Sequence, residues 1–371
     1  MPLNRPDSPR DWIAIALRDG TACPDFEGFQ VKDLVAAAEH EHVVPMLEWR
    51  LRNGSHWHEL PEDFRHALRD GARAAAMKSM FRENEQQRVA KVLLHEGLRG
   101  LLLKGNAIAF WLYPQPYLRV TGDIDLLLAS REDAHLAAQA LSGLGYELAF
   151  NPGSMNYEMT SRLTTNGMSR SEIDLHFRLI NSVLYADIFS FEELWEASFA
   201  LDGINESLRA LAPVHALANA CLNRALDIQN DEPDRLKLLY DIHLMLSRMD
   251  VSAWTGFIQV VREKGICGIC LRSIEDAMAV LCTPVPDNVM QELSGYADAE
   301  PLDRNRLQDW RYMQWQSLWA LPTWRARARW VWERLLPTRE QMRELHGRDS
   351  GLPVLLWRRI KRGFVRVGGR S

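Results

Sequence analysis

Apolar residues recur at steps of three and four positions through the first hundred residues of the chain. The segments 11–20, 31–51 and 61–98 carry this spacing most clearly. A period near 3.6 places the apolar side chains on one face of a helix, so the pattern predicts amphipathic helices. We therefore expect residues 1–97 to form a helical N-terminal region.

The pattern then changes to short apolar runs that are bounded by turn residues. Such runs predict strands, and they lie at 98–105, 119–129, 146–150, 156–164 and 170–179. Helical spacing returns between some of these runs, with Asn106 and Ser130 as the expected N-caps. Residues 98–185 are therefore predicted to form a compact core of about five strands and at least two helices.

Helical spacing dominates again from residue 186 onward. The amphipathic segments are 211–227, 232–249, 272–282 and 307–336. We expect residues 186–345 to form a helical C-terminal region and residues 346–371 to form a basic tail. Together the patterns predict an α+β fold in which a small mixed sheet is flanked by helical regions.

Composition supports an ordinary globular protein. The 371 residues are 47% hydrophobic and 25% charged, which excludes wholesale disorder and a collagen-like chain. The five cysteines are too sparse for a disulfide scaffold and fit a reducing compartment, so we expect a cytoplasmic protein. The N-terminus lacks the apolar core of a secretory signal, and no apolar run reaches the roughly 18–20 residues that span a bilayer.

Charge is unevenly distributed along the chain. Residues 303–371 hold 16 basic and 6 acidic residues, a balance of +10, whereas residues 1–302 hold 28 basic and 43 acidic residues, a balance of −15. This asymmetry points to a membrane surface or an acidic partner that the basic tail contacts, or to contact between the tail and the acidic body.

Two carboxylates, Asp123 and Asp125, stand one residue apart on the predicted strand 119–129. Side chains two positions apart leave the same face of a strand, so Ile124 and Leu126 face the core on the other side. Two negative charges side by side are unfavourable unless a positive group lies between them. A divalent cation is the usual neutralising group, and hard oxygen ligands suit Mg²⁺ or Mn²⁺.

The predicted strand 170–179 repeats this alternation, because Glu172, Asp174 and His176 share one face. Asp174 supplies a third carboxylate on another strand. It would complete a site for one or two metal ions of the kind that serves phosphoryl transfer. Glu172 and His176 are interpreted as supporting residues, and a lone histidine beside a sheet is more often a structural hydrogen-bonding group than a ligand.

Lys104 and Gly105 lie between a predicted strand and the start of a helix. Glycine lets the backbone approach a phosphate, a helix N-terminus favours an anion, and lysine supplies a positive charge. Arg119 precedes Asp123 by four residues and is a further phosphate-binding candidate. The alternative for Arg119 is a pairing with a carboxylate.

The segments LLLKGNAIAFWLY, LRVTGDIDLLL and SEIDLHFRL, in this order, resemble a family of bacterial nucleotidyltransferases, a divergent branch of the DNA polymerase β-like superfamily. The helical residues 1–97 and the segment RWVWERLLPTREQMRE are also similar to this branch. The resemblance implies a small mixed-sheet nucleotidyltransferase core. By position, Asp123 and Asp125 match the metal-binding pair, Asp174 matches the third carboxylate, and Gly105 matches the glycine of the nucleotide turn.

The resemblance implies an enzyme that uses Mg²⁺ or Mn²⁺ and moves a nucleoside monophosphate from a nucleoside triphosphate, such as ATP, to an acceptor hydroxyl that the sequence does not identify. One departure is Lys104-Gly105, which stands where the superfamily has Gly-Ser, so a phosphate-contacting hydroxyl is missing. This departure favours an alternative, a non-catalytic sensor or partner-binding protein with the same fold. A third hypothesis is an enzyme that moves a different phosphoryl-type group.

Six tryptophans fall within 310–332 and are interleaved with arginines 311, 325, 327 and 329. Such a set binds single-stranded nucleic acid by stacking, or lies at a membrane interface. We favour a helical cap in which the tryptophans form core and the arginine stems cover them. For 352–366, contact with a membrane or an acidic partner stays open.

Cys267 and Cys270 are interpreted as two small core residues one helical turn apart rather than as zinc ligands.

Overall fold

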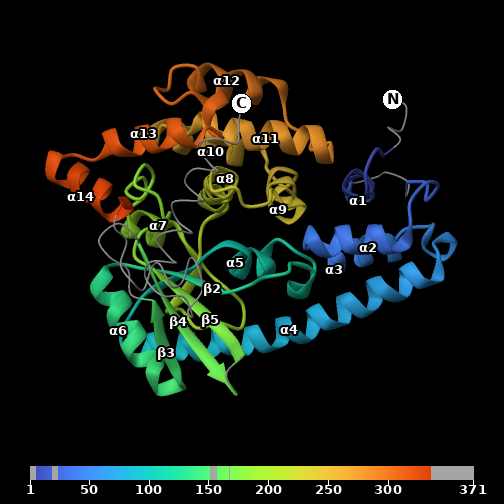
Figure 1. Cartoon of the computed structure of the whole chain (residues 1–371), viewed down its shortest axis with the longest axis horizontal. Coiled ribbons are helices and arrows are strands. Elements are labelled where there is room, and N and C mark those ends of the chain that lie inside the picture. The colour runs from blue at the N-terminus through green and yellow to red at the C-terminus, as the bar shows by residue number, and fades with distance from the viewer. Residues whose placement is uncertain (1–5, 19–23, 151–156, 167, 336–371) are drawn as a thin grey trace.

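The fold combines one mixed sheet with helices on several sides, as the sequence pattern predicts. The computed structural model describes residues 6–18, 24–150, 157–166 and 168–335. The N-terminal region is helical, with α1 (Pro9–Leu17), α2 (Val31–His40), α3 (Val44–Arg52) and the long α4 (Glu62–His95). Figure 1 shows α4 running beneath α2 and α3 and reaching the strands of the sheet.

The sheet has seven strands in the order β3-β4-β5-β2-β1-β7-β6. The strands are β1 (Gly100–Leu102), β2 (Ile124–Leu128), β3 (Tyr146–Phe150), β4 (Glu158–Thr165), β5 (Met168–His176), β6 (Phe199–Ala200) and β7 (Leu208–Ala210). β2 runs parallel to β5 and β1 runs parallel to β7, while the other neighbours are antiparallel. The pattern of the sequence misses β6 and β7, which follow residue 185 and are too short to carry an alternation.

Three helices belong to the sheet region: α5 (Lys104–Trp111), α6 (Arg131–Leu141) and α7 (Phe191–Ala197). Ser130 caps α6 as predicted, because its hydroxyl accepts a hydrogen bond of 3.0 Å from the Asp133 amide. The prediction that Asn106 caps α5 is wrong. The helix begins two residues earlier, and the Asn106 side chain instead donates to the Asp123 carbonyl at 2.6 Å.

The C-terminal region is helical up to residue 335. Its helices are α8 (Pro213–Gln229), α9 (Leu236–Leu246), α10 (Val251–Glu263), α11 (Cys267–Leu281), α12 (Asp287–Ala297), α13 (Trp310–Ala320) and α14 (Trp324–Leu335). Cys267 and Cys270 are free thiols that are buried on α11, which confirms the interpretation as core residues. The predicted tail 346–371 and its segment 352–366 lie outside the described residues.

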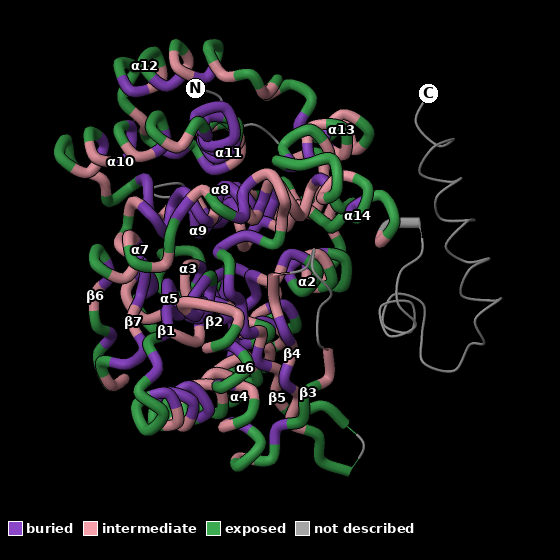
Figure 2. The backbone as a smooth tube through the Cα atoms, turned by 90° about the vertical axis from the view of Figure 1, so that its left-hand side faces the viewer, coloured by how far each residue is buried: buried purple, intermediate pink, exposed green. Residues whose placement is uncertain are grey.

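Two hydrophobic cores share α4 between them. Phe64 and Leu68, near its start, join the core that unites the N-terminal and C-terminal helices. Val89 and Leu93, near its end, join the second core between the sheet, α4 and α6. Figure 2 shows buried backbone running through both the helical layers and the sheet. Because one continuous helix contributes to both cores, it holds the sheet and the N-terminal helices in a fixed relation.

The tryptophan-rich segment differs from the favoured prediction of a helical cap. Trp330 is buried, but Trp315, Trp319, Trp324 and Trp332 are each more than half exposed. Sequence spacing alone does not distinguish a core-facing aromatic stripe from one that faces outward. In the part of the chain that the structure describes, no helix is both long and apolar enough to cross a bilayer.

Candidate functional site

The carboxylates predicted from the alternation lie together at one face of the sheet. Asp125 on β2 pairs in register with Asp174 on the neighbouring parallel strand β5. Ile124 and Ile173 also pair, and both are fully buried in the opposite core. Asp123 directly precedes β2 and is exposed. The predicted division into a polar face and a core face is therefore confirmed.

Lys104 is the immediate partner of Asp125. The end of β1 places it there, because the Leu103 amide donates to the Asp125 carbonyl at 3.0 Å. The Lys104 Nζ atom lies 2.6 Å from Asp125 Oδ1. Lys104 also has a φ angle of 51°, a left-handed conformation that is uncommon for a residue other than glycine. This backbone directs its side chain across the turn toward the carboxylate.

The pKa of Asp125 reflects this partner. Burial alone disfavours a carboxylate, but the Lys104 ammonium and the hydrogen bond to His176 hold the pKa of Asp125 well below its usual range. The charge of Asp125 in turn raises the pKa of Lys104, against the effect of burial. Asp125 is therefore a permanently ionised carboxylate at neutral pH.

The other two carboxylates of the predicted site, Asp174 and Asp123, have no comparable ion pair with a lysine among the described residues. Burial raises the pKa of Asp174 to about 6, and the charge of Asp125 adds to the shift. Thr160 on β4 donates a 2.7 Å hydrogen bond to Asp174. The pKa of Asp123 is raised by partial burial and by the charges of Glu172 and Asp125. This face therefore carries more negative charge than its neighbours compensate.

The donor set fits a hard divalent cation in its chemistry. Three carboxylates gather at one face, and two of them have raised pKa values that a nearby cation would lower. Within the described residues, however, no group of three or more potential ligands converges on one point. Lys104 lies where a cation would be expected, but both Lys104 and His176 contact Asp125 through Oδ1 rather than Oδ2. The residues thus fit the ion, although they are not arranged as a preformed cage.

Gly105 permits a close approach of the chain that precedes β2. A Cβ atom at this position would lie 2.9 Å from both Arg119 Nη1 and Thr121 Cγ2, which is closer than real contacts. Glycine is therefore required here for packing, in addition to any contact with phosphate. The glycine of the Lys-Gly turn is therefore explained by packing as well as by phosphate binding.

Arg119 forms a buried ion pair with Asp241 on α9. Its Nη2 atom lies 2.6 Å from Asp241 Oδ2, and its Nε atom lies 2.8 Å from Oδ1. The Tyr113 hydroxyl donates to the same carboxylate at 2.6 Å. The structure thus shows the carboxylate pairing that the sequence left open as the alternative for Arg119.

Glu172 and His176 surround the carboxylates as supporting residues. Glu172 accepts a 2.6 Å contact from Arg162 on β4. His176 is buried, and its Nε2 atom lies 3.2 Å from Asp125 Oδ1. Its Nδ1 atom lies 3.4 Å from a carboxylate oxygen of Glu158. His176 therefore hydrogen-bonds to Asp125, lies close to Glu158, and helps to fix the position of Asp125.

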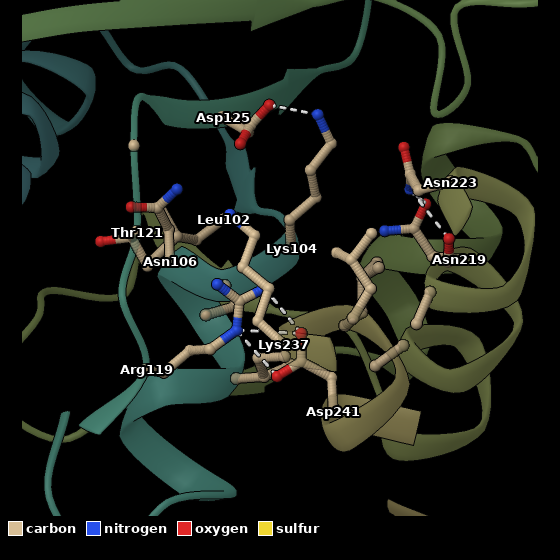
Figure 3. A pocket seen from close by; sticks show the side chains of 18 of the residues that line it. Leu102, Lys104, Asn106, Arg119, Thr121, Asp125, Asn219, Asn223, Lys237 and Asp241 are labelled. Carbon is tan, nitrogen blue, oxygen red and sulfur yellow. Dashed lines mark hydrogen bonds and ion pairs between the residues drawn. The ribbon is translucent and has the colours of Figure 1, made fainter. Parts of the chain in front are cut away.

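A cavity of about 190 Å³ opens between the Lys-Gly turn and the helices α8 and α9. Figure 3 shows Lys104 and Asp125 at one side of it, and Arg119 and Asp241 at another. Gly105 and Asp123 also line the cavity, whereas Asp174, Glu172 and His176 are not among its lining residues. The structure thus brings five of the eight predicted site residues to one cavity.

Further polar residues line this cavity that sequence reasoning did not assign to the site. They come from α8, α9 and the segment between these helices: Asn219, Asn223, Asp227, Arg235 and Lys237. Asn219 and Asn223 stand one turn apart on α8, and their side chains are hydrogen-bonded at 2.7 Å. That spacing was a detectable signal. Arg82 on α4, whose charge interacts with Asp123 and Asp125, left no comparable signal.

Lys237 makes the far wall of the cavity electropositive. Burial and the nearby Arg119 lower the pKa of Lys237 to about 8, and its Nζ atom lies 3.2 Å from His42 Nδ1. Arg235 adds a guanidinium whose buried Nε atom has no hydrogen-bond partner among the described residues. A phosphate group would neutralise these cations, whereas Asp123 and Asp125 lie on the side of the Lys-Gly turn.

Comparison with known proteins identifies one related family. Residues 27–281 match the model of a family described as uncharacterised nucleotidyltransferase. This range covers more than half of the chain and includes the carboxylates, the Lys-Gly turn and the helices α8 and α9. No curated protein and no solved structure matches the chain.

Proposed function

The chain belongs to the uncharacterised nucleotidyltransferase family, and from this premise we propose that it transfers a nucleoside monophosphate from a nucleoside triphosphate, such as ATP, to an acceptor hydroxyl. The observation that carries the proposal is the register of Asp125 with Asp174 on parallel strands. It is supported by a cavity whose wall combines Asp123 and Asp125 with Lys104 and Lys237. Carboxylates facing cations across one cavity are what a triphosphate site requires.

The residues divide the work of binding the donor. Asp123, Asp125 and Asp174 would hold Mg²⁺ or Mn²⁺, which supplies Lewis-acid charge to the phosphates when bound. Lys104 and Lys237 would balance the negative charge of the phosphates from two sides of the cavity. A phosphate beside Lys104 would compete with Asp125 for its ammonium group, so donor binding would release Asp125 to act as a ligand.

Asp174 is the proposed acceptor of the proton. The acceptor oxygen attacks the α-phosphorus, the bond from that phosphorus to the bridging oxygen of the β-phosphate breaks, and pyrophosphate leaves. The hydroxyl proton passes to the Asp174 carboxylate. In the absence of a metal ion, burial raises the pKa of Asp174 to about 6, so the free carboxylate is ionised at neutral pH and is a stronger base than an ordinary aspartate. A bound cation would lower that pKa.

The test is a search for the product in a mixture of acceptors. The full chain is incubated with Mg²⁺, a metabolite extract and a triphosphate that carries an isotope label in the nucleoside. Mass spectrometry should find a molecule heavier by one labelled nucleoside monophosphate, and pyrophosphate should accumulate in proportion. Asp123→Asn/Asp125→Asn should abolish both signals, and phosphate transfer in place of nucleotide transfer would contradict the proposal.

The non-catalytic alternative has one observation in its favour, the ion pair between Lys104 and Asp125. A sensor would bind the triphosphate and release no pyrophosphate with any acceptor. A cytoplasmic location, expected from the sparse cysteines, is part of the proposal for either function.

A further inference from the structure

The helices α13 and α14 expose a cluster of tryptophans. The exposed fractions are 59% for Trp315, 51% for Trp319, 72% for Trp324 and 64% for Trp332. Single exposed apolar side chains are ordinary on protein surfaces, but four tryptophans on two consecutive helices form a patch of the kind that marks an interaction site.

The exposed apolar side chains of these two helices, Trp315, Trp319, Trp324, Val331 and Trp332, are called here the aromatic face. Trp315 and Trp319 are one turn apart, and their ring centroids are 5.5 Å apart. The other three lie along one stripe of α14, since their spacing of seven and eight residues returns to the same side of a helix. Arg327 on α14 joins the two helices, because its guanidinium lies 4.5 Å from the ring centroid of Trp319.

The charge around the aromatic face selects an anionic partner. Residues 310–335 contain five arginines and one acidic residue. They belong to the C-terminal segment 303–371 with a balance of +10, whereas residues 1–302 have a balance of −15. Figures 1 and 2 both show α13 and α14 at an outer edge of the molecule. The matched family range ends at residue 281, so this face lies outside it.

The arginines are arranged for a lipid interface rather than for a nucleic-acid strand. Arg327 donates to the Leu321 carbonyl at 3.1 Å, and Arg329 pairs with Glu333 at 3.0 Å. These guanidinium groups are engaged locally, whereas a strand-binding groove presents its cations to successive phosphates. Tryptophan and arginine side chains on an outer helical edge suit the headgroup region of a bilayer, where the rings lie between water and acyl chains.

We propose that the aromatic face docks the protein on the surface of an anionic lipid bilayer. The contact is peripheral, with the tryptophan rings at headgroup level and the exposed Arg325 beside the lipid phosphates. It is independent of the nucleotide site, so loss of docking leaves nucleotide binding unchanged.

Vesicle flotation of the full chain tests this docking. Phosphatidylcholine vesicles that contain phosphatidylglycerol should carry the protein upward, and neutral vesicles or high salt should carry much less. Trp315→Ser/Trp319→Ser and, separately, Trp324→Ser/Trp332→Ser should each weaken binding at least tenfold, on the order expected for the apolar area removed. Arg325→Gln should weaken it about fivefold.

A matched control removes exposed apolar side chains elsewhere. Met77 and Met80 on α4 are 73% and 71% exposed, so Met77→Ser/Met80→Ser should leave flotation unchanged. Thermal melting verifies that each variant is folded. The proposal is overturned if the wild type does not float, or if both tryptophan variants float as well as the wild type. It is also overturned if those variants instead abolish self-association or oligonucleotide binding while flotation persists.

Discussion

The ion pair between Arg119 and Asp241 fixes one wall of the cavity, and its removal should be costly. Only 6% of the Arg119 side chain and 4% of the Asp241 side chain are exposed. Asp241→Ala would leave a buried guanidinium and the Tyr113 hydroxyl without the carboxylate to which both donate. Breaking a buried pair from one side costs about 3–5 kcal/mol, and an abandoned hydroxyl adds about 1–3 kcal/mol.

We therefore expect Asp241→Ala to lower the free energy of unfolding by about 4–8 kcal/mol. The triple variant Arg119→Met/Asp241→Leu/Tyr113→Phe removes all three polar groups and keeps similar volumes. It should lie within about 2 kcal/mol of the wild type, because apolar replacement of a buried pair is often neutral.

Urea-induced unfolding followed by circular dichroism measures both variants. A single-variant loss below about 1 kcal/mol would refute the reasoning, since it would mean that water reaches the pair and screens it. A triple variant as unstable as Asp241→Ala would also refute it, because the cost would then come from packing and not from unpaired charge.

Three further predictions concern the turn and the carboxylates. Gly105→Ala should lower the free energy of unfolding by about 1–3 kcal/mol, because the added Cβ atom would meet Arg119 and Thr121. The control Gly122→Ala places its Cβ atom in open space and should be tolerated when both variants are compared by thermal melting. Asp174→Asn should stabilise the metal-free protein at pH 7. The pKa of Asp174 is higher in the folded state than in the unfolded state, so ionisation of Asp174 lowers the free energy of unfolding of the wild type by about 1–3 kcal/mol as pH rises from 4 through 6. Equal stability of the two proteins at pH 7 would contradict this. Lys104→Met should raise the pKa of Asp125 above its present low value, as carboxyl titration by NMR would detect, and an unchanged pKa would mean that His176 alone controls it.

The alternation of polar and apolar residues was sufficient to predict the faces of β2 and β5. Strand side chains have a period of two, so the core positions of Ile124 and Ile173 follow from local sequence. The register that brings Asp125 beside Asp174 does not, because it depends on how distant strands pair. The identity of the third carboxylate was therefore predictable from its pattern and the family resemblance, and its distance was not.

Features that depend on packing between distant segments could not be predicted from the sequence. Arg119 pairs with Asp241, which lies 122 residues further along the chain. The position of Arg119 also requires a glycine at residue 105, because a Cβ atom there would be too close to the Arg119 side chain. The helices α8 and α9 were predicted correctly as helices, but nothing in the periodicity of α9 says that Lys237 faces the cavity. The tryptophans of α13 and α14 fit either a core or a surface by spacing, and only the packed structure exposes them.

The central claim is a metal-dependent nucleotide site at Asp123 and Asp125, and ligand-induced thermal stabilisation tests it without knowledge of the acceptor. The full chain and Asp123→Ala/Asp125→Ala are melted with each nucleoside triphosphate, with and without Mg²⁺ or Mn²⁺. A ligand that binds only the folded state raises the melting temperature, by an amount equivalent to about 2.7 kcal/mol at a hundredfold excess over its dissociation constant. The account predicts a metal-dependent rise with at least one triphosphate that the double variant loses. A cooperative melt that no triphosphate shifts, or an equal shift in the double variant, would contradict it.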